Sequence, residues 1–347
     1  MDEPDPDSTR RYSRQIRIPG IGEAGQQAIG ASTVLVVGLG ALGTHAADTL
    51  ARAGTGNLWL CDRDIVDWTN LQRQVLFTEA DAAAGTPKAI AAAQALRAAN
   101  SAISIEAHVE HCSAEFLDAL PRVPDLVLDG TDNFPTRYLL NDWCSQHDVP
   151  WIYAGAVGNE GVAALFPAGG PCLRCLWPTP PSGSDVASCE TAGILAPAIA
   201  SVTAFQTAEA LKLLAGRSDD NTKGLFTCDV WRGQYGVTKL MANPDPDCPV
   251  CQGREFPALQ AGQSEAVTLC GRDAVQIDPP GRRAIDLEAL AAKLQGAVEE
   301  LERTRHLLRF TADNARFSVF PGGRTLVFGI PDPLRARALF DRWVGID

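Results

Sequence analysis

Short aliphatic runs alternate with longer helical patterns through the first two-thirds of the chain. The run Thr33–Val37 is β-branched or aliphatic at every position and predicts a buried strand, and Ala41–Ala53 predicts the helix that follows it. The same patterns predict further strands at residues 57–62, 103–109, 126–129, 151–157, 161–166, 225–230 and 235–241, and further helices at 22–31, 87–99, 113–120, 134–147 and 193–215. This alternation indicates an α/β fold, with a Rossmann-like, mostly parallel sheet and flanking helices.

The pattern changes towards the carboxyl terminus, where short strands dominate. Residues 254–266 have no clear periodicity and predict a linker. After them, strands are expected at 267–269, 275–277, 307–310, 316–320 and 324–328, and helices at 287–303 and 333–344. Pro321-Gly-Gly323 predicts a hairpin between the last two strands. We therefore expect a large α/β domain at 11–253 and a small α+β domain of unknown role at 267–347.

Composition and charge argue against several classes of function. Hydrophobic residues make up 46% of the 347 residues, which is enough for a sizeable core, and a net charge of −12 argues against nucleic-acid and membrane-surface partners. Residues 1–10 are acidic and proline-rich, which predicts a disordered tail and not a signal peptide. No apolar run approaches the length needed to span a bilayer. We therefore expect a cytoplasmic protein.

A glycine-rich turn joins the first strand to its helix. Gly38, Gly40 and Gly43 fit the pattern G-x-G-x-x-G, in which glycines allow a tight turn, close approach of a phosphate, and close packing of helix on strand. The helix that begins at Ala41 offers its first N–H groups and its positive dipole end to an anion. Asp62, about 20 residues further on, ends the second strand where a ribose-binding acid is expected. These features predict a nucleotide site, for which NAD is the first candidate ligand.

Further polar residues modify that interpretation. Asn70, Arg73 and Gln74 form a cluster after the second strand, and the planar fork of arginine matches phosphate oxygens, so the cluster suits a triphosphate better than NAD. Lys88 lies at a helix N-terminus, where a cation opposes the helix dipole. We therefore expect Lys88 to meet an anion, with a solvated surface lysine as the alternative.

Two side chains follow the strand at 126–129. Asp132 lies at the same edge of the sheet as the glycine turn, which predicts a magnesium ligand, with a simple turn residue as the alternative. Asn133 is expected to cap the helix at 134–147.

Four of the ten cysteines form two C-x-x-C pairs, Cys172 with Cys175 and Cys248 with Cys251. Two such pairs predict a tetrahedral four-cysteine metal site, with zinc as the default metal and an iron–sulfur cluster as the alternative. Because four thiolates leave no open coordination position, we expect a structural role. Cys189 has no C-x-x-C partner, and it is either a reactive thiol or a small packed residue.

Together these motifs resemble the ThiF/MoeB family of adenylyltransferases, which activate ubiquitin-like sulfur-carrier proteins and are related to ubiquitin-activating enzymes. The matching stretches, within about residues 11–252, are Arg11-Tyr-Ser-Arg14-Gln, Gly38-Leu-Gly-Ala-Leu-Gly43, Asp62 with Asn70-Leu-Gln-Arg-Gln74, Pro87-Lys88, Thr131-Asp-Asn133 with Arg137, both C-x-x-C pairs, and Cys189. The resemblance implies that the chain binds ATP, Mg²⁺ and the Gly-Gly carboxyl terminus of a ThiS/MoaD-type carrier. It would then join that carboxylate to AMP and release pyrophosphate.

The resemblance also implies roles for single residues. Asp62 matches the ribose-binding acid, Asp132 matches the magnesium-binding acid, and Arg14 matches an arginine that reaches across a homodimer to the partner's triphosphate. Cys189 matches a cysteine that some members use in sulfur transfer, so a cysteine desulfurase or another sulfur donor is a further expected partner. The residues that match phosphate-binding positions are Asn70, Arg73 and Lys88. The expected nucleotide-binding set is Gly38, Gly40, Ala41, Gly43, Asp62, Asn70, Arg73, Gln74, Lys88, Asp132 and Asn133.

Other functions stay open at this point. A nicotinamide oxidoreductase would not need Arg73 together with Lys88, and a relative that adenylates a tRNA base usually lacks a four-cysteine site. A non-catalytic scaffold would not need an intact set of phosphate-site residues. The pathway is undecided between thiamine, molybdopterin and another sulfur product. Residues 267–347 do not resemble a rhodanese domain, because they show no active-site loop built around a cysteine.

Overall fold

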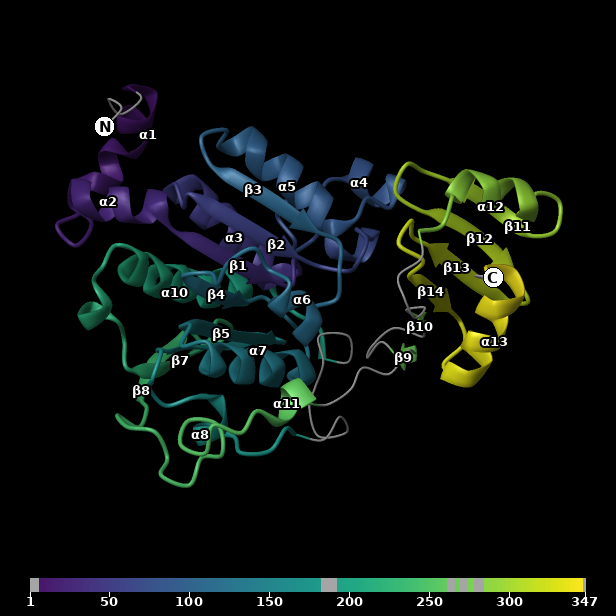
Figure 1. Cartoon of the computed structure of the whole chain (residues 1–347). Coiled ribbons are helices and arrows are strands. Elements are labelled where there is room, and N and C mark those ends of the chain that lie inside the picture. The colour runs from purple at the N-terminus through teal and green to yellow at the C-terminus, as the bar shows by residue number, and fades with distance from the viewer. Residues whose placement is uncertain (1–5, 182–191, 261–265, 269–273, 278–283, 346–347) are drawn as a thin grey trace. The chain divides into compact units, whose positions relative to one another are not determined.

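The computed structural model describes residues 6–181, 192–260, 266–268, 274–277 and 284–345. The chain divides into two compact units, Met1–Ala261 and Gly262–Asp347, and each unit has its own β-sheet (Figure 1). The residues predicted to carry chemistry belong to the first unit.

An eight-stranded sheet forms the centre of the first unit, in the order β3-β2-β1-β4-β5-β6-β7-β8. Its strands are β1 (Thr33–Val37), β2 (Asn57–Cys61), β3 (Ser104–His108), β4 (Leu126–Asp129), β5 (Trp151–Val157), β6 (Glu160–Phe166), β7 (Gly224–Asp229) and β8 (Gln234–Lys239). Neighbours from β3 to β5 pair in parallel, and neighbours from β5 to β8 pair antiparallel. The expected Rossmann-like α/β fold is confirmed.

Helices cover both faces of this sheet. Successive side chains of a buried strand point to opposite faces, so both faces of the sheet are apolar and both need to be covered. In β1, Val34 and Val36 belong to one hydrophobic core, and Leu35 and Val37 belong to the other. The helices of the unit are α1 (Pro6–Ile16), α2 (Gly22–Ala31), α3 (Ala41–Ala53), η1 (Trp68–Asn70), α4 (Glu79–Ala84), α5 (Lys88–Ala99), α6 (Ala114–Asp118), α7 (Phe134–Gln146), α8 (Leu173–Leu176), α10 (Ala196–Leu214), η2 (Ser218–Asp220) and α11 (Pro257–Gln260). The first core packs with α3, α5 and α10, and the second packs with α6 and α7. Within the described part of the chain, no helix combines the length and the apolar character that crossing a membrane requires.

The first helix, α1, overlaps the predicted disordered tail, so that prediction is wrong for residues 6–10. Tyr12 is 8% exposed, and its hydroxyl accepts a hydrogen bond from Asn100 Nδ2 at 2.8 Å. The ring packs so closely on Gly54 that a Cβ at Gly54 would overlap it. Gln15 Nε2 also donates to the carbonyl oxygen of Ala53 at 2.9 Å. These tertiary contacts stabilise a helix that composition did not indicate.

Residues 254–260 pack on the first unit and do not form a free linker. The Arg254 guanidinium donates to the carbonyl oxygens of Ser145 and Gln146, at the carboxyl end of α7, at 2.8 and 3.1 Å. The α11 helix then begins within the predicted linker at 254–266. The linker prediction is therefore wrong for these residues, because contacts with α7 order a segment that has no periodicity of its own.

The second unit contains a six-stranded antiparallel sheet in the order β11-β12-β13-β14-β10-β9. Its elements are β9 (Ala266–Thr268), β10 (Ala274–Ile277), α12 (Leu287–Leu294), β11 (Glu299–Arg303), β12 (Leu308–Ala312), β13 (Ala315–Val319), β14 (Thr325–Phe328) and α13 (Pro333–Trp343). The helix predicted at 287–303 is wrong beyond Leu294. Gly296 has a φ of +80°, which suits the end of a helix, and the residues of β11 pair with β12 instead.

Candidate functional site

Close backbone contacts shape the glycine turn between β1 and α3. Gly38 has a φ of +84°, and a Cβ there would lie 2.7 Å from the carbonyl oxygen of Gly130. A Cβ on Gly43 would overlap the carbonyl oxygen of Gly38. In contrast, a Cβ on Gly40 would meet no atom closer than 3.9 Å. The fold itself therefore requires Gly38 and Gly43. The absence of a side chain at Gly40 instead leaves open space through which a ligand can approach the backbone.

Asp62 follows β2 and binds two backbone N–H groups. Its Oδ2 accepts a hydrogen bond from Leu39 N at 2.6 Å, and its Oδ1 accepts one from Asp64 N at 2.6 Å. Burial raises the pKa of Asp62, and the positive charge of Lys88 opposes that shift. The carboxylate therefore fixes the glycine turn against the end of β2, at the position where the motif predicts a ribose-binding acid.

Lys88 is buried at the N-terminus of α5, with 3% of its surface exposed. Its backbone N–H donates to Asp64 O at 2.8 Å, and its Nζ lies 3.4 Å from Asp64 Oδ2. The alternative of a solvated surface lysine is therefore wrong. A buried cation at a helix N-terminus is unfavourable unless negative charge balances it, and Asp64 supplies part of that charge.

The polar cluster after β2 forms η1 and the turn that follows. Asn70 is 4% exposed, and its Oδ1 accepts a hydrogen bond from Asp67 N at 3.1 Å. Arg73 Nη1 donates to Thr69 O at 2.7 Å. These bonds hold both side chains on a short, fixed segment.

Gln74 faces the glycine turn from this cluster. It is 3% exposed, and its Nε2 lies 4.0 Å from the position that a Cβ on Gly40 would occupy. Its Oε1 is buried and has no hydrogen-bond partner among the residues that the structure describes. Since buried polar atoms normally have a partner, this oxygen fits a polar ligand or an ordered water beside Gly40.

The loop after β4 carries Asp132 and Asn133. Asn133 Oδ1 accepts a hydrogen bond from Thr136 N at 2.9 Å, which confirms that Asn133 caps α7. Asp132 is exposed, and its Oδ1 lies 3.5 Å from Asn133 Nδ2. The carboxylate is therefore accessible to a cation.

A buried ion pair that the sequence analysis did not predict supports this loop. Arg137 Nε donates to Asp129 Oδ2 at 3.0 Å, and Arg137 Nη2 donates to the carbonyl oxygens of Thr131 and Ala154 at 2.8 and 3.0 Å. Asp129 Oδ1 in turn accepts a hydrogen bond from Thr131 N at 2.8 Å. Arg137 belongs to the family match, but nothing in the sequence pattern indicates its partner. The pair positions the backbone that carries Asp132.

One predicted site residue, Arg14, is not brought together with the rest. Arg14 is exposed on α1, which packs through Tyr12 on Gly54 at the carboxyl end of α3. The glycine turn lies at the amino end of α3, and a helix of 13 residues is about 20 Å long. Cys189, also predicted as a site residue, lies outside the described residues.

The two C-x-x-C pairs come together as one four-cysteine site. The four Sγ atoms lie within 4.8 Å of one another. Cys172 Sγ is 3.7 Å from Cys248 Sγ, and Cys175 Sγ is 3.5 Å from Cys251 Sγ. A tetrahedral zinc site with Zn–S bonds of ~2.3 Å has sulfur atoms about 3.8 Å apart. The arrangement therefore fits a zinc ion.

Backbone N–H groups also point at these sulfur atoms. Cys175 Sγ accepts hydrogen bonds from Cys172 N at 3.5 Å and from Asp245 N at 3.4 Å, and Cys248 Sγ accepts one from Cys251 N at 3.5 Å. A hydrogen bond from the Cys251 thiol lowers the pKa of Cys172 to about 5, whereas burial raises the pKa of Cys248 to about 11. Such N–H groups around a site stabilise the thiolates that ligate a metal.

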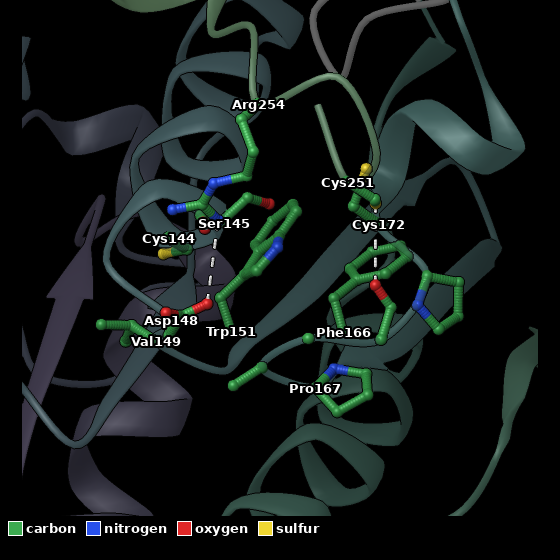
Figure 2. Close-up of a pocket in the computed structure, with 14 residues that line it drawn as sticks. Cys144, Ser145, Asp148, Val149, Trp151, Phe166, Pro167, Cys172, Cys251 and Arg254 are labelled. Carbon is green, nitrogen blue, oxygen red and sulfur yellow. Dashed lines mark hydrogen bonds and ion pairs between the residues drawn. The ribbon is translucent and has the colours of Figure 1, made fainter. Parts of the chain in front are cut away.

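A small cavity of about 40 Å³ lies beside the cysteine site (Figure 2). Cys172, Cys251, Arg254 and Trp151 are among the residues that line it. Its volume suits one or two water molecules and is too small for a nucleotide. The carboxyl edge of the sheet is therefore the better candidate for the nucleotide site.

Comparisons with known proteins show which family this chain is related to. A model of the ThiF family matches residues 12–250. The sulfur carrier protein ThiS adenylyltransferase of Bacillus subtilis (strain 168) is 38% identical over 339 residues, which cover 97% of this chain and 100% of that protein. The adenylyltransferase and sulfurtransferase MOCS3 of Bos taurus is 40% identical, and the match covers 71% of this chain and 53% of that protein. The crystal structure of E. coli MccB with ATP superposes with a TM-score of 0.59 at 25% identity, covering 70% of this chain and 74% of that chain.

Proposed function

The chain belongs to the ThiF family, and we propose that it adenylates the carboxyl terminus of a ubiquitin-like sulfur-carrier protein, with ATP as the second substrate. The relatives support this proposal, since the ThiS adenylyltransferase of B. subtilis aligns over its whole length. Neither relative reported above is named as a nicotinamide oxidoreductase or a tRNA-adenylating enzyme.

The proposal rests mainly on one observation: a glycine with free space in front of its backbone and a buried lysine both lie close to the carboxylate of Asp62. Gly40 has free space in front of its backbone, and Lys88 is buried near Asp62, whose carboxylate binds Leu39 N next to that glycine. A polyphosphate at this edge would receive backbone N–H groups from the start of α3 and positive charge from Lys88. This combination suits a nucleoside triphosphate better than a dinucleotide.

The proposed roles follow from charge and position. Asp62 binds the ribose, Lys88, Arg73 and Asn70 bind the phosphates, and Asp132 holds a magnesium ion that neutralises phosphate charge. Because Asp132 stands on a loop whose backbone is held by a buried ion pair, that backbone is already in place before the substrate arrives.

The reaction needs no nucleophile from the enzyme. The ionised carboxylate of the carrier forms a bond to the α-phosphorus of ATP, and the bond from that phosphorus to the bridging oxygen of pyrophosphate breaks. The enzyme's contribution is to align the two substrates and to stabilise the negative charge on the phosphates. The cations and amides of this edge of the sheet are suited to that task.

We further propose that the active enzyme is a homodimer with composite sites. Arg14 is exposed at the far end of α3 from the glycine turn of its own chain. Its guanidinium is therefore available to the triphosphate of a second copy, as the family resemblance implies. In a closed two-fold dimer, each copy would complete the site of the other.

The carrier is best assigned to the ThiS type, which would place the enzyme in thiamine biosynthesis. The B. subtilis relative aligns with 97% of this chain, so the alignment includes most of the second unit, whereas the MOCS3 match covers 71%. A MoaD-type carrier for molybdopterin is the alternative.

Cys189 is the candidate acceptor if a sulfur donor such as a cysteine desulfurase is a partner. We assign the reaction to the cytoplasm, because a four-cysteine site needs reduced thiols.

The metal proposal is one structural zinc ion bound by Cys172, Cys175, Cys248 and Cys251. The thiolates would connect two segments that are distant in sequence and would leave no coordination position for a substrate. Elemental analysis should find about one zinc per chain, since the described residues form one site of four cysteine ligands. Iron with a brown chromophore would contradict the assignment.

The test is ATP–pyrophosphate exchange with each ubiquitin-like carrier of the source organism. We expect carrier-dependent exchange, and Lys88→Ala should lower it by about 100-fold because a charge that stabilises the transition state is lost. Lys223→Ala is the matched control. Lys223 is exposed and precedes β7, which runs in the same direction as β1, so it lies at the amino ends of the parallel strands, away from the glycine turn. An unchanged rate in Lys88→Ala, or NAD reduction with no ATP turnover, would refute the proposal.

A further inference from the structure

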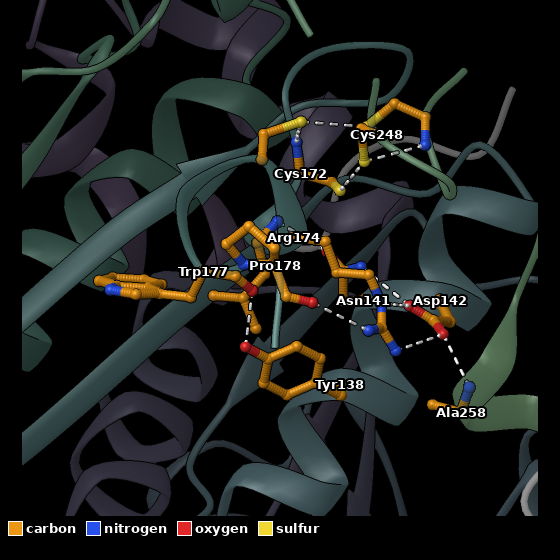
Figure 3. Close-up of polar contacts among 12 residues, drawn as sticks. Tyr138, Asn141, Asp142, Cys172, Arg174, Trp177, Pro178, Cys248 and Ala258 are labelled. Carbon is orange, nitrogen blue, oxygen red and sulfur yellow. Dashed lines mark hydrogen bonds and ion pairs between the residues drawn. The ribbon is translucent and has the colours of Figure 1, made fainter. Parts of the chain in front are cut away.

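A second buried ion pair lies next to the four-cysteine site (Figure 3). Arg174, between the first two cysteine ligands, donates from Nε to Asp142 Oδ1 at 2.9 Å and from Nη2 to Asp142 Oδ2 at 3.0 Å. The Asp142 side chain is 0% exposed, and the Arg174 side chain is 9% exposed. A bidentate pair of this kind has a fixed geometry, so it fixes the orientation of the turn at Cys172–Cys175, the cysteine turn, relative to α7.

The same carboxylate also binds the segment after the second cysteine pair. Asp142 Oδ2 accepts a hydrogen bond from Ala258 N at 2.9 Å, and Asp142 Oδ1 accepts one from Asn141 Nδ2 at 3.0 Å. Asn141 Oδ1 accepts a further bond from Leu173 N at 2.8 Å. Asp142 therefore joins α7, the cysteine turn and α11 at one point.

Arg174 acts on a third segment, the chain that leaves the cysteine turn. Its Nη1 lies 3.4 Å from Pro178 O, and its guanidinium stacks 4.7 Å from the centre of the Tyr138 ring. The Tyr138 hydroxyl donates to Trp177 O at 2.7 Å. The side chains of Tyr138 and Arg174 thus hold the backbone carbonyl groups of Trp177 and Pro178, as Figure 3 shows.

We propose that Arg174 and Asp142 are positioning residues that transmit the state of the four-cysteine site to residues 177–181 and 254–260. A metal ion fixes the turn that carries Arg174, and Arg174 fixes Asp142, which then binds α11. Without the metal, the cysteine turn and Arg174 lose their fixed orientation, and both segments lose partners. The metal would thus control the order of two surface segments that contribute no ligand to it.

Backbone hydrogen exchange in the full-length protein tests this coupling, because exchange reports local opening without any assay of activity. Residues 178, 180 and 181 are prolines without an amide hydrogen, so exchange in 177–181 is read at Trp177, whose N–H donates to Leu173 O at 2.8 Å. In the wild type, removal of zinc with a chelator should speed exchange at Trp177 and at 254–260 by at least about tenfold, as expected when charge-assisted bonds are lost. Unchanged exchange in both segments would overturn the proposal.

Variants separate the ion pair from the metal itself. Arg174→Lys keeps the charge but loses the bidentate fork, so the zinc-loaded variant should already exchange like the zinc-free wild type in both segments. Tyr138→Phe removes only the hydroxyl that binds Trp177 O, so it should speed exchange at the Trp177 amide and leave 254–260 unchanged. Asp142→Asn, which keeps the shape and removes the charge, replaces Arg174→Lys if that variant does not fold. If a zinc-loaded variant of the pair keeps wild-type exchange in both segments, the pair does not transmit the state of the metal.

Discussion

Gly40 and Gly43 belong to one motif, but the packing of the chain requires only one of them. A Cβ on Gly43 would overlap a backbone oxygen, whereas a Cβ on Gly40 would have 3.9 Å of clearance. Gly40→Ala should therefore keep the wild-type unfolding temperature and weaken ATP binding at least about tenfold, which is ~1.4 kcal/mol. Gly43→Ala should lower the free energy of unfolding by about 3 kcal/mol or more.

Calorimetry measures these quantities. Titration with ATP gives the affinity of Gly40→Ala, and thermal unfolding gives the stability of both variants. If Gly40→Ala unfolds early while binding ATP normally, Gly40 is a structural glycine, and the space in front of it is not the phosphate site.

Single residues were predictable from the sequence where a local pattern marks them. The glycine spacing and the helix start at Lys88 are such patterns. The ion pairs of Arg137 with Asp129 and of Arg174 with Asp142 were not, because their members are 8 and 32 residues apart and the fold alone brings them together. Their burial depends on the packing of α7, which sequence periodicity does not specify.

At the scale of elements, Glu209 shows how one buried carboxylate joins a helix to a turn. It stands on α10 and is 1% exposed, and it accepts hydrogen bonds from Asn221 Nδ2, Thr222 N and Lys212 Nζ at 2.9, 2.7 and 2.6 Å. Burial alone would raise its pKa, but these bonds together hold the pKa of Glu209 below the usual 4.5.

A carboxyl group whose pKa is lowered by folding stabilises the protein above the unfolded value and loses that effect as pH falls through the folded value. Glu209→Gln should therefore cost about 1–3 kcal/mol at neutral pH and show a smaller loss of stability than the wild type below about pH 4.5. Urea unfolding at a series of pH values measures this. Parallel curves for the two proteins would show that Glu209 does not contribute through its charge.

Most elements of the first unit follow from local pattern, and the exceptions have physical causes. The β1 strand and the α3 helix have the predicted bounds, because an aliphatic run and a glycine turn specify them. The segment at 299–303 reads as helix from its Glu, Leu and Arg content, but strand pairing with β12 provides its backbone partners. The contacts of Tyr12 likewise order α1, which composition assigns in part to a tail.

At the scale of the whole molecule, the composite-site proposal predicts complementation between two inactive variants. Arg14→Ala lacks the arm that reaches the partner, and Lys88→Ala lacks its own phosphate ligand. After subunit exchange at equal concentrations, half of the dimers are mixed and each mixed dimer has one intact site, so about a quarter of wild-type exchange activity should return. Native mass spectrometry verifies the mixing. Absence of activity in verified mixed dimers would contradict the composite site.

The division into two units predicts where the chain can be shortened. A chain that ends at Ala261 should fold, bind zinc and catalyse carrier-dependent exchange, because the proposed ATP and zinc residues precede that point. A chain that ends at Gly253 should be less stable, because it loses Arg254 and α11, which bind α7. Thermal unfolding and zinc content compare the two chains. If the Ala261 chain folds and binds zinc but forms no adenylate, the second unit takes part in the reaction.

The α3 helix connects the two parts of the proposed composite site, and this limits how evolution can change its length. Its first turn follows Gly40, and its last residue precedes Gly54, on which α1 packs. One inserted residue would move the far end of the helix by about 1.5 Å and rotate it by about 100°, and α1 with Arg14 would move with it. In a dimer that displacement would appear at the neighbour's phosphates. Insertions and deletions among natural variants should therefore be confined to surface loops and absent from this helix.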